Sequence, residues 1–438
     1  MKNRILLISV AVVLALSVGL VGCAPAEEAP TKVVIGVSSD LTVPLSPIRA
    51  AALTPIRLIY FAELNAAGGI LLKKYGADYK VLVEFLEYDD GGSVETMLTN
   101  TEKLITEDNV DFMFGATGTA MISAQAPLVN SLKHVLLTVE GGATTMKETL
   151  PGMPYVFVNL SFSDWYELPV LAKMLQEKGA ATAYVVWIQD LHGIEYNSVA
   201  NLEFGAKNIT IVKSVSISAD PATAAAQAPG IVADAKGYGA DVFCMFAYVP
   251  HVLALTGQAI AQNLTPKAMI GGPCANFGFY GLALGGNVTG IMCFATANNK
   301  TSPAMATMFN KIETGMNGVG GYPGFYFLDW WGHPIYWSVM QIWQQAVEAI
   351  GYVDQDELKN TLKTGTFNTV LGPAVKYKMF GTGGGYLDYI YHTGEIGQWQ
   401  PGGPFGNTVE VVGYTNITSD LPNYVVTAPF IYPKPPWP

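Results

Sequence analysis

Short apolar runs rich in β-branched and aromatic residues alternate, over most of residues 32–300, with longer segments in which apolar residues recur every three or four positions. The short runs predict buried strands, and the longer segments predict amphipathic helices. Strands that alternate with helices form parallel sheets covered on both faces, so the pattern predicts an α/β fold. The predicted strands are 33–37, 81–87, 112–114, 135–139, 183–188, 209–215, 242–246 and 268–270, and the predicted helices are 56–66, 94–107, 120–131, 164–178, 197–206, 223–236 and 252–262.

The predicted strands fall into two groups, four before Pro151 and four after Asn159, which indicates two consecutive α/β lobes. After residue 301 the pattern changes to long helices, predicted at 304–314 and 325–350. Beyond residue 381 the chain is rich in Gly, Pro and Tyr and contains isolated strands. We expect these late segments to complete the lobes that begin earlier in the chain.

The first 23 residues resemble the signal of a bacterial lipoprotein. Two positive charges are followed by an apolar run over residues 5–20 and by the sequence LVGC at 20–23. The resemblance implies cleavage before Cys23, a lipid on that cysteine, and a membrane-anchored position outside the cytoplasm, in the periplasm or at the cell surface. The alternative is an uncleaved transmembrane helix, for which the run is near the lower limit of length. Residues 24–31 contain two prolines and two glutamates and are expected to form a tether.

Composition excludes several classes of function. The net charge is -11 and the three arginines of the 438 residues are Arg4, Arg49 and Arg57, so the sequence predicts no nucleic-acid partner. The five histidines lie far apart, and the sequence contains no metal-binding, phosphate-loop or nucleophile-elbow motif. We therefore expect no metal, no cofactor and no covalent chemistry.

Three cysteines follow Cys23, namely Cys244, Cys274 and Cys293, and no pair of them has the spacing of a metal site. Two interpretations stay open. Either a disulfide joins Cys274 and Cys293, or two of the three are buried thiols and one is a loop thiol.

Several local stretches together resemble one family. They are KVVIGV at 32–37, AELNAAGGI at 62–70, EYDD at 87–90, GATGTA at 115–120, GGAT at 141–144 and TFNTVLGP at 366–373. The chain from about 31 to 373 is similar to the leucine/isoleucine/valine-binding-protein family, the type I periplasmic solute-binding lipoproteins of ABC transporters. The NAAGGI stretch is the most specific part of this resemblance.

The resemblance implies an α/β fold of two doubly wound parallel-sheet lobes joined by a three-stranded hinge, with ligand held between the lobes at the carboxyl edges of both sheets. Such edges are where open α/β sheets generally bind ligands. The expected domains are a signal peptide at 1–22, a lipid-anchored tether at 23–31, lobe 1 at 32–158 plus 297–375, and lobe 2 at 159–296 plus 376–438.

The resemblance also implies a set of ligand-binding residues. Thr117, Gly118 and Thr119 form a turn at a predicted helix start, whose N–H groups suit a carboxylate; the alternative is an ordinary helix cap by Thr119. In the next loop, Ala143 and Thr144 match positions that offer a carbonyl and a hydroxyl. From lobe 2, His192, Tyr248 and Cys274 match residues of the site wall.

The sequence departs from the family where amino-acid binders carry a carboxylate for the ligand ammonium. The matching positions here are Pro273 and Cys274, and a buried ammonium without a counter-charge is unfavourable, although Asp164 or Glu140 could substitute. Arg49, with Arg57 near it, is expected beside the cleft, where a guanidinium suits an anion; the alternative is a surface ion pair. The preferred ligand is a small carboxylate with an apolar or aromatic body, ahead of a branched-chain amino acid.

We therefore expect a lipid-anchored binding protein that captures a small molecule by lobe closure and delivers it to an ABC permease and its ATPase. One alternative is a ligand-sensing lobe that reports to a signalling partner, and a less favoured one is an extracytoplasmic hydrolase.

Overall fold

A computed structural model describes residues 28–42, 46–139, 141, 144–159, 163–387, 395–413 and 424–438. The predicted lipidation site Cys23, the predicted ligand contact Ala143 and Glu140 lie outside these residues. Residues 32–438 form one compact unit, to which the following description applies, and residues 1–31 are a separate unit. In the described part of the chain, no helix has the length and apolar character needed to cross a membrane.

Two sheets organise the chain. The strands of the first sheet lie in the order β14-β15-β6-β5-β4-β1-β3-β2 and pair in parallel, except that β2 and β14 pair antiparallel at the two edges. Their bounds are β1 Lys32–Ser39, β2 Ile70–Leu71, β3 Lys80–Asp89, β4 Phe112–Phe114, β5 Leu136–Thr138, β6 Val156–Val158, β14 Tyr377–Met379 and β15 Gly385–Leu387.

The second sheet has the strand order β17-β16-β11-β10-β9-β7-β8, with β16 and β17 antiparallel to their neighbours and the other pairs parallel. A separate antiparallel pair, β12 Phe367–Thr369 and β13 Gly372–Val375, follows the long helices. The bounds in the second sheet are β7 Thr182–Ile188, β8 Thr210–Ile217, β9 Val242–Ala247, β10 Ala268–Pro273, β11 Ile291–Phe294, β16 Ile396–Pro401 and β17 Asn407–Val411.

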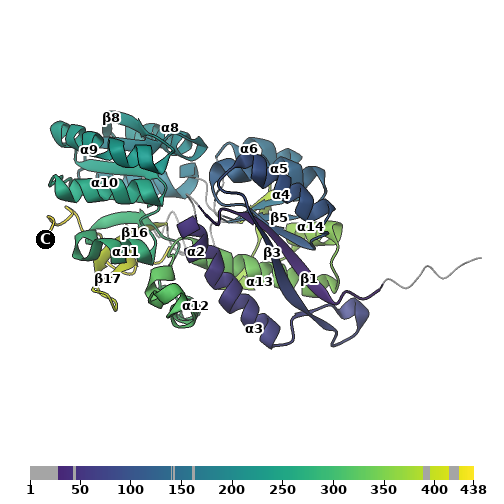
Figure 1. Cartoon of the computed structure of the whole chain (residues 1–438). Coiled ribbons are helices and arrows are strands. Elements are labelled where there is room, and N and C mark those ends of the chain that lie inside the picture. The colour runs from purple at the N-terminus through teal and green to yellow at the C-terminus, as the bar shows by residue number, and fades with distance from the viewer. Residues whose placement is uncertain are drawn as a thin grey trace, which may run out of the picture. The chain divides into compact units, whose positions relative to one another are not determined.

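Helices cover both sheets (Figure 1). With the first sheet lie α2 Ser46–Pro55, α3 Phe61–Ala66, α4 Val94–Thr106, α5 Thr119–Ser131, α6 Met146–Thr149, α12 Pro303–Gly315, α13 Gly332–Ile350 and α14 Gln355–Thr364. With the second sheet lie α7 Leu168–Glu177, α8 Leu191–Ala206, α9 Pro221–Tyr238, α10 Val249–Ala261 and α11 Gly278–Leu284. Shorter helical turns are η1 Ile56–Tyr60, η2 Lys73–Tyr75, η3 Leu150–Gly152, η4 Ser163–Glu167, η5 Gly285–Val288, η6 Val319–Gly321 and η7 Gly324–Phe327.

Successive residues of a strand point to opposite faces, and the core of the first lobe follows this rule. Phe112 of β4 packs on Trp343 of α13, with 5.5 Å between the ring centroids. The next residue, Met113, packs in a second cluster with Ile122 and Val129 of α5. Figure 1 shows α5 and α13 on opposite sides of this sheet. The predicted fold class, two α/β lobes with mostly parallel sheets, is confirmed.

The chain passes between the sheets after β6, after β11 and after β15, so the predicted boundary of lobe 1 at residue 375 is wrong. Strands β14 and β15 belong to the first sheet, where β15 pairs with β6. The glycine run explains the pairing, because a side chain at Gly383 or Gly384 would collide with backbone oxygens of Leu150 and Val156. Tyr377 adds a buried 2.5 Å hydrogen bond to Asn159.

The helix predicted over 325–350 is also interrupted. The turn η7 ends at Phe327 and α13 begins at Gly332, so residues 328–331 are not helical. Pro334 lies in the first turn of α13, a position where proline suits a helix start. The periodic apolar pattern runs through this break and conceals it.

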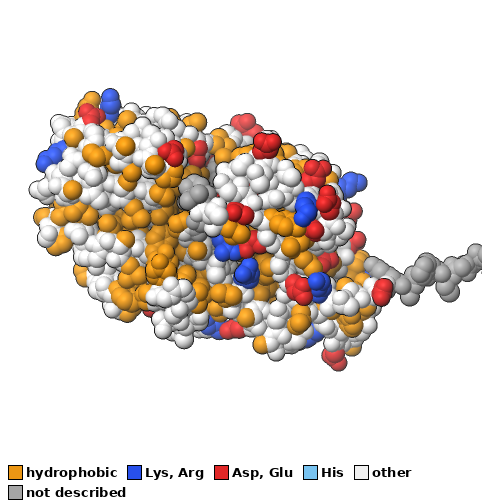
Figure 2. All heavy atoms as spheres, viewed as in Figure 1, with side chains coloured by type: hydrophobic (Ala, Val, Ile, Leu, Met, Phe, Trp, Pro, Cys, Tyr) orange, Lys and Arg blue, Asp and Glu red, His pale blue; other side chains and the backbone are white. Residues whose placement is uncertain are grey.

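The face drawn in Figure 2 shows charged side chains gathered mainly over the first lobe, whereas hydrophobic side chains cover more of the second.

Candidate functional site

The carboxyl ends of the parallel strands bring two groups of loops together. In the first lobe these loops follow β4 and β5, and in the second lobe they follow β7, β9 and β10. Parallel strands end at the same edge of a sheet, so loops that are far apart in the sequence lie side by side.

The turn at residues 117–119 joins β4 to α5. Gly118 has a positive φ of 99°, a conformation that suits glycine, and α5 begins at Thr119. Thr117 and Thr119 are both buried. The loop after β5 lies directly on this turn, because a side chain at Gly141 would approach the nitrogen of Thr119 to 2.9 Å. The turn is therefore closely packed, with its helix-start N–H groups near the second lobe.

Tyr248 of the second lobe meets this turn. Its hydroxyl lies near the Thr119 N–H and near the carboxylate of Asp190. Burial raises the pKa of Tyr248 well above its ordinary value, and Asp190 and the nearby Cys274 thiol raise it further, while the Thr119 N–H acts in the opposite direction. Tyr248 is consequently neutral and lies beside the helix start of the other lobe.

His192 lies between two tyrosines. Its ring stacks on Tyr248 at 5.2 Å and contacts Tyr196 at 4.6 Å, measured between centroids. Asp190 orients this part of α8 as its N-cap, accepting a 2.9 Å hydrogen bond from the Gly193 N–H. Burial lowers the pKa of His192 to about 4, and its Nε2 has no hydrogen-bond partner. The imidazole is therefore uncharged at neutral pH.

Thr144 makes a second contact between the lobes. Its hydroxyl lies 2.6 Å from Oε1 of the buried Glu195, to which it donates. Asp164, a proposed substitute for the missing carboxylate, forms an ion pair with Lys147. Its charge is thus already compensated.

Arg49 forms an ion pair with Glu87, and an ion pair was the alternative predicted for this residue. Its Nε donates to Glu87 at 2.8 Å, and a second guanidinium nitrogen binds the other oxygen of the same carboxylate. Arg57 also donates to Glu87, at 3.0 Å, and Ser39 does so at 2.7 Å. The Arg49 side chain is only 17% exposed, so this pair is partly buried rather than superficial.

The three cysteines of the second lobe are buried thiols, and no disulfide joins them. Burial raises the pKa of Cys244 and Cys293, so both are protonated at neutral pH. Cys274 lies in the loop after β10, beside Tyr248 as described above.

Asp329 was not predicted from the sequence. It is fully buried in the break between η7 and α13, and it accepts a 2.6 Å hydrogen bond from Asn276, in the same loop as Cys274. The available signal was Pro334, because a proline in the first turn indicates that the helix starts close before it.

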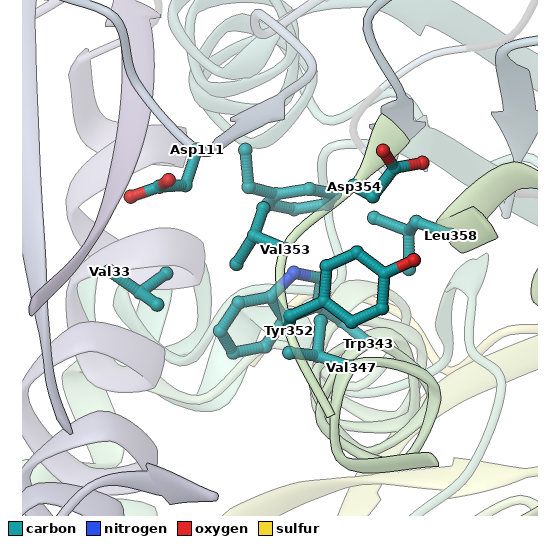
Figure 3. A pocket seen from close by; sticks show the side chains of 9 residues that line it. Val33, Asp111, Trp343, Val347, Tyr352, Val353, Asp354 and Leu358 are labelled. Atoms are coloured by element: carbon teal, nitrogen blue, oxygen red, sulfur yellow. The ribbon is translucent and has the colours of Figure 1, made fainter. Parts of the chain in front are cut away.

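Two further observations limit the chemistry. No group of three or more His, Cys, Asp or Glu side chains is arranged to hold a metal ion within the described ranges. A depression in the first lobe, between Val33, Asp111, Trp343, Tyr352 and Asp354, has no interior space for a water molecule (Figure 3). In it, Asp111 accepts a 2.7 Å hydrogen bond from the Val34 N–H and supports β1.

The fold and the facing loop groups define a two-lobed α/β binding protein. The family model described as periplasmic binding protein matches residues 32–388. The chain therefore belongs to the periplasmic binding protein family, which confirms the resemblance found in the sequence. No curated protein sequence matches the chain.

Solved structures show the same fold at low sequence identity. A solute-binding protein of an ABC transporter from Rhodopseudomonas palustris, in complex with 3,4-dihydroxybenzoic acid, has a TM-score of 0.69 and 15% identity, covering 87% of this chain and 96% of its own. Another from R. palustris, in complex with benzoate, has a TM-score of 0.69 and 17% identity, covering 86% and 95%. The branched-chain amino acid transporter substrate-binding protein from Streptococcus pneumoniae, in complex with isoleucine, has a TM-score of 0.66 and 17% identity, covering 87% and 100%.

Replacing Arg49 with Gln is expected to lower the free energy of unfolding by about 1–3 kcal/mol, because the Glu87 carboxylate loses charged hydrogen-bond donors. Denaturant unfolding measures this change. Lys32→Gln is the control, since the Lys32 pair with Glu84 is about half exposed and contributes at most about 1 kcal/mol. Unchanged stability together with a selective loss of affinity for carboxylates would instead place Arg49 in contact with ligand, as the sequence predicted.

His192→Phe is expected to change the pH dependence of stability. The pKa of His192 is about 4 in the folded chain and 6.5 in the unfolded one, so the unfolded chain binds the proton more tightly and stability falls as the pH drops from 6.5 toward 4. The His192→Phe variant keeps a ring between the two tyrosines but does not lose stability in this way. In the unmodified protein the loss of folding stability is at most about 1.4 kcal/mol per pH unit. Parallel unfolding profiles for both proteins between these pH values would contradict the buried neutral state of His192.

Proposed function

We propose that this protein is the solute-binding component of an ABC importer and that its ligand is a small carboxylate with an aromatic or apolar body. The observation that carries the proposal is the meeting of the Thr119 N–H, at the start of α5, with neutral aromatic side chains of the other lobe.

A carboxylate fits the turn at residues 117–119 for physical reasons. The first N–H groups of a helix have no partners within the helix, and the helix dipole favours negative charge there. No side chain caps α5 at Gly118, so no capping side chain occupies these donors. In the proposed complex the ligand carboxylate binds the turn and takes the place of the Tyr248 hydroxyl at the Thr119 N–H, with Thr117, Thr144 and Cys274 nearby and Ala143 in the second loop, as the family resemblance implies.

The other side of the site favours a flat, uncharged body. His192 stacks between Tyr196 and Tyr248, and Tyr196 contacts Phe246 and Phe294, with ring centroids 5.4 and 5.8 Å apart. Aromatic ligands gain from offset stacking and edge contacts with such rings. The benzoate-bound and dihydroxybenzoate-bound structures of similar fold support this ligand class. A branched-chain amino acid is the second candidate, supported by the isoleucine-bound structure.

The transport role follows from the family and the predicted leader. Closure of the lobes around the ligand buries it, and the closed form is the state that an ABC permease and its ATPase would recognise. A lipid on Cys23 would hold the protein at the membrane outside the cytoplasm, without preventing the two lobes from moving. The protein would bind and release its ligand unchanged.

A thermal-shift screen of the chain without residues 1–23 tests the ligand class. Benzoate and its relatives are expected to stabilise the protein, since a ligand at 100 times its Kd adds about 2.7 kcal/mol. Leucine, valine, benzamide and a panel of sugars serve as comparisons. Stabilisation by sugars alone, or no stabilisation by any acid, would overturn the proposal, and stabilisation by leucine with benzoate inert would select the second candidate.

Thr119→Leu is expected to abolish binding of the stabilising acid, because a larger apolar side chain obstructs the turn while the fold persists. Titration calorimetry measures the affinity, and circular dichroism verifies folding. The matched control is Thr223→Leu, which changes a threonine in the exposed first turn of α9. Retained affinity in a folded Thr119→Leu protein would exclude this turn from the carboxylate site.

A further inference from the structure

Asn276 and Asp329 form a buried polar pair between two segments of the chain. Both are inaccessible to solvent, and the Asn276 Nδ2 donates to Asp329 Oδ1 at 2.6 Å. The same oxygen accepts hydrogen bonds from the backbone of Trp331 at 3.0 Å and of Gly332 at 2.9 Å. These three donors fix the carboxylate in one orientation.

The remaining polar atoms of this group have no partners. Asp329 Oδ2, Asn276 Oδ1 and Trp331 Nε1 are all buried and make no hydrogen bond. Buried polar atoms are normally paired, and an unpaired one disfavours the folded state, so three on neighbouring residues require an explanation. Two of these atoms are acceptors and the third is a donor, so a hydroxyl group can donate its proton toward the acceptors and accept a hydrogen bond from the donor.

Aromatic rings connect this group to the candidate site. Trp331 packs on Phe294 with 6.0 Å between centroids, and Phe294 contacts Tyr196, which in turn contacts His192. Asn276 lies two residues beyond Cys274 in the loop after β10. The pair is therefore linked to the candidate site in two ways, through the rings of Phe294 and Tyr196 and through the loop that carries Cys274.

We propose that Asp329 and Asn276 accept a hydrogen bond from a hydroxyl group on the ligand, at the end of the ligand opposite its carboxylate. The inference rests on the proposed function and specifies its ligand as a hydroxyl-bearing aromatic acid. The ammonium of an α-amino acid is next to its carboxylate. It would therefore lie near the Thr119 turn and not at the opposite end of the ligand, where Asp329 is. Trp331 Nε1 can donate to the oxygen of the same hydroxyl. Burial raises the pKa of Asp329, and the hydrogen bonds from Gly332, Asn276 and Trp331 act in the opposite direction.

Titration calorimetry with benzoate, 4-hydroxybenzoate and 4-methoxybenzoate tests the inference on the unmodified chain. The hydroxyl compound is expected to bind at least tenfold more tightly than the other two, since only it can donate to Asp329. Equal affinities for benzoate and 4-hydroxybenzoate would overturn the inference while leaving the proposed function intact. Binding of none of the three would overturn the proposed function itself.

Asp329→Asn then identifies the acceptor. The carbonyl oxygen of the new asparagine can keep the three existing donors, so its NH₂ group lies where Oδ2 was. An NH₂ group cannot accept a hydrogen bond from the ligand hydroxyl. The preference for the hydroxyl compound is therefore expected to disappear, while benzoate still binds. Asp111→Asn is the matched control, because it changes another largely buried carboxylate that lies in the first lobe. Retention of the hydroxyl preference by a folded Asp329→Asn protein would overturn the assignment. The assignment would also be overturned if the unmodified chain binds leucine and Asp329→Asn abolishes that binding while Asp111→Asn does not. Should the variant not fold, the comparison of ligands on the unmodified chain decides the inference by itself.

Discussion

The hydroxyl of Tyr248 lies where the two lobes meet, close to the start of α5. The Thr119 N–H of the first lobe and the Asp190 carboxylate of the second lobe both lie near this hydroxyl. Because Asp190 also caps α8, the same carboxylate orients His192, whose ring stacks on Tyr248. One chain of contacts thus sets the helix start of the first lobe, the tyrosine and the histidine relative to one another. In the proposed complex, a ligand that binds the Thr119 N–H exchanges with the tyrosine hydroxyl beside that donor.

That exchange favours anions over neutral ligands. A phenol oxygen is a weaker acceptor than a carboxylate, and the donors at a helix start interact more strongly with a negative charge. The charged groups nearby do not compete, because Arg49 is bound to Glu87 and Lys147 to Asp164. In the proposed complex, the selectivity for a carboxylate would therefore depend on backbone N–H groups, with Arg49 bound to Glu87.

The sequence predicted those features that follow from strand order. Tyr248 and Cys274 follow the neighbouring parallel strands β9 and β10, so their proximity could be predicted from the alternation of strands and helices. Thr119 follows a strand of the other sheet, and its place opposite them was implied only by the family resemblance. The partner of Arg49 could not be predicted in this way, because Glu87 is 38 residues away and only the pairing of β1 with β3 brings that part of the chain near. Strand β15 was misplaced for a similar reason, since its glycines pack on backbone oxygens that leave no trace in the hydrophobic pattern.

Asp329 shows what a periodic pattern conceals at a buried polar position. The apolar residues around it continue the spacing of α13, yet the carboxylate accepts N–H groups at the start of that helix instead of lying within it. A carboxylate held by three donors on one oxygen has a fixed direction for the other. If a ligand donates to that second oxygen, its length between carboxylate and hydroxyl has to match a distance set by two rigid elements, α5 and α13. Selectivity would then come from the ligand's geometry as well as its charge, because an acid that is too short leaves Asp329 Oδ2 unpaired and forgoes the stabilisation that a matching hydroxyl provides.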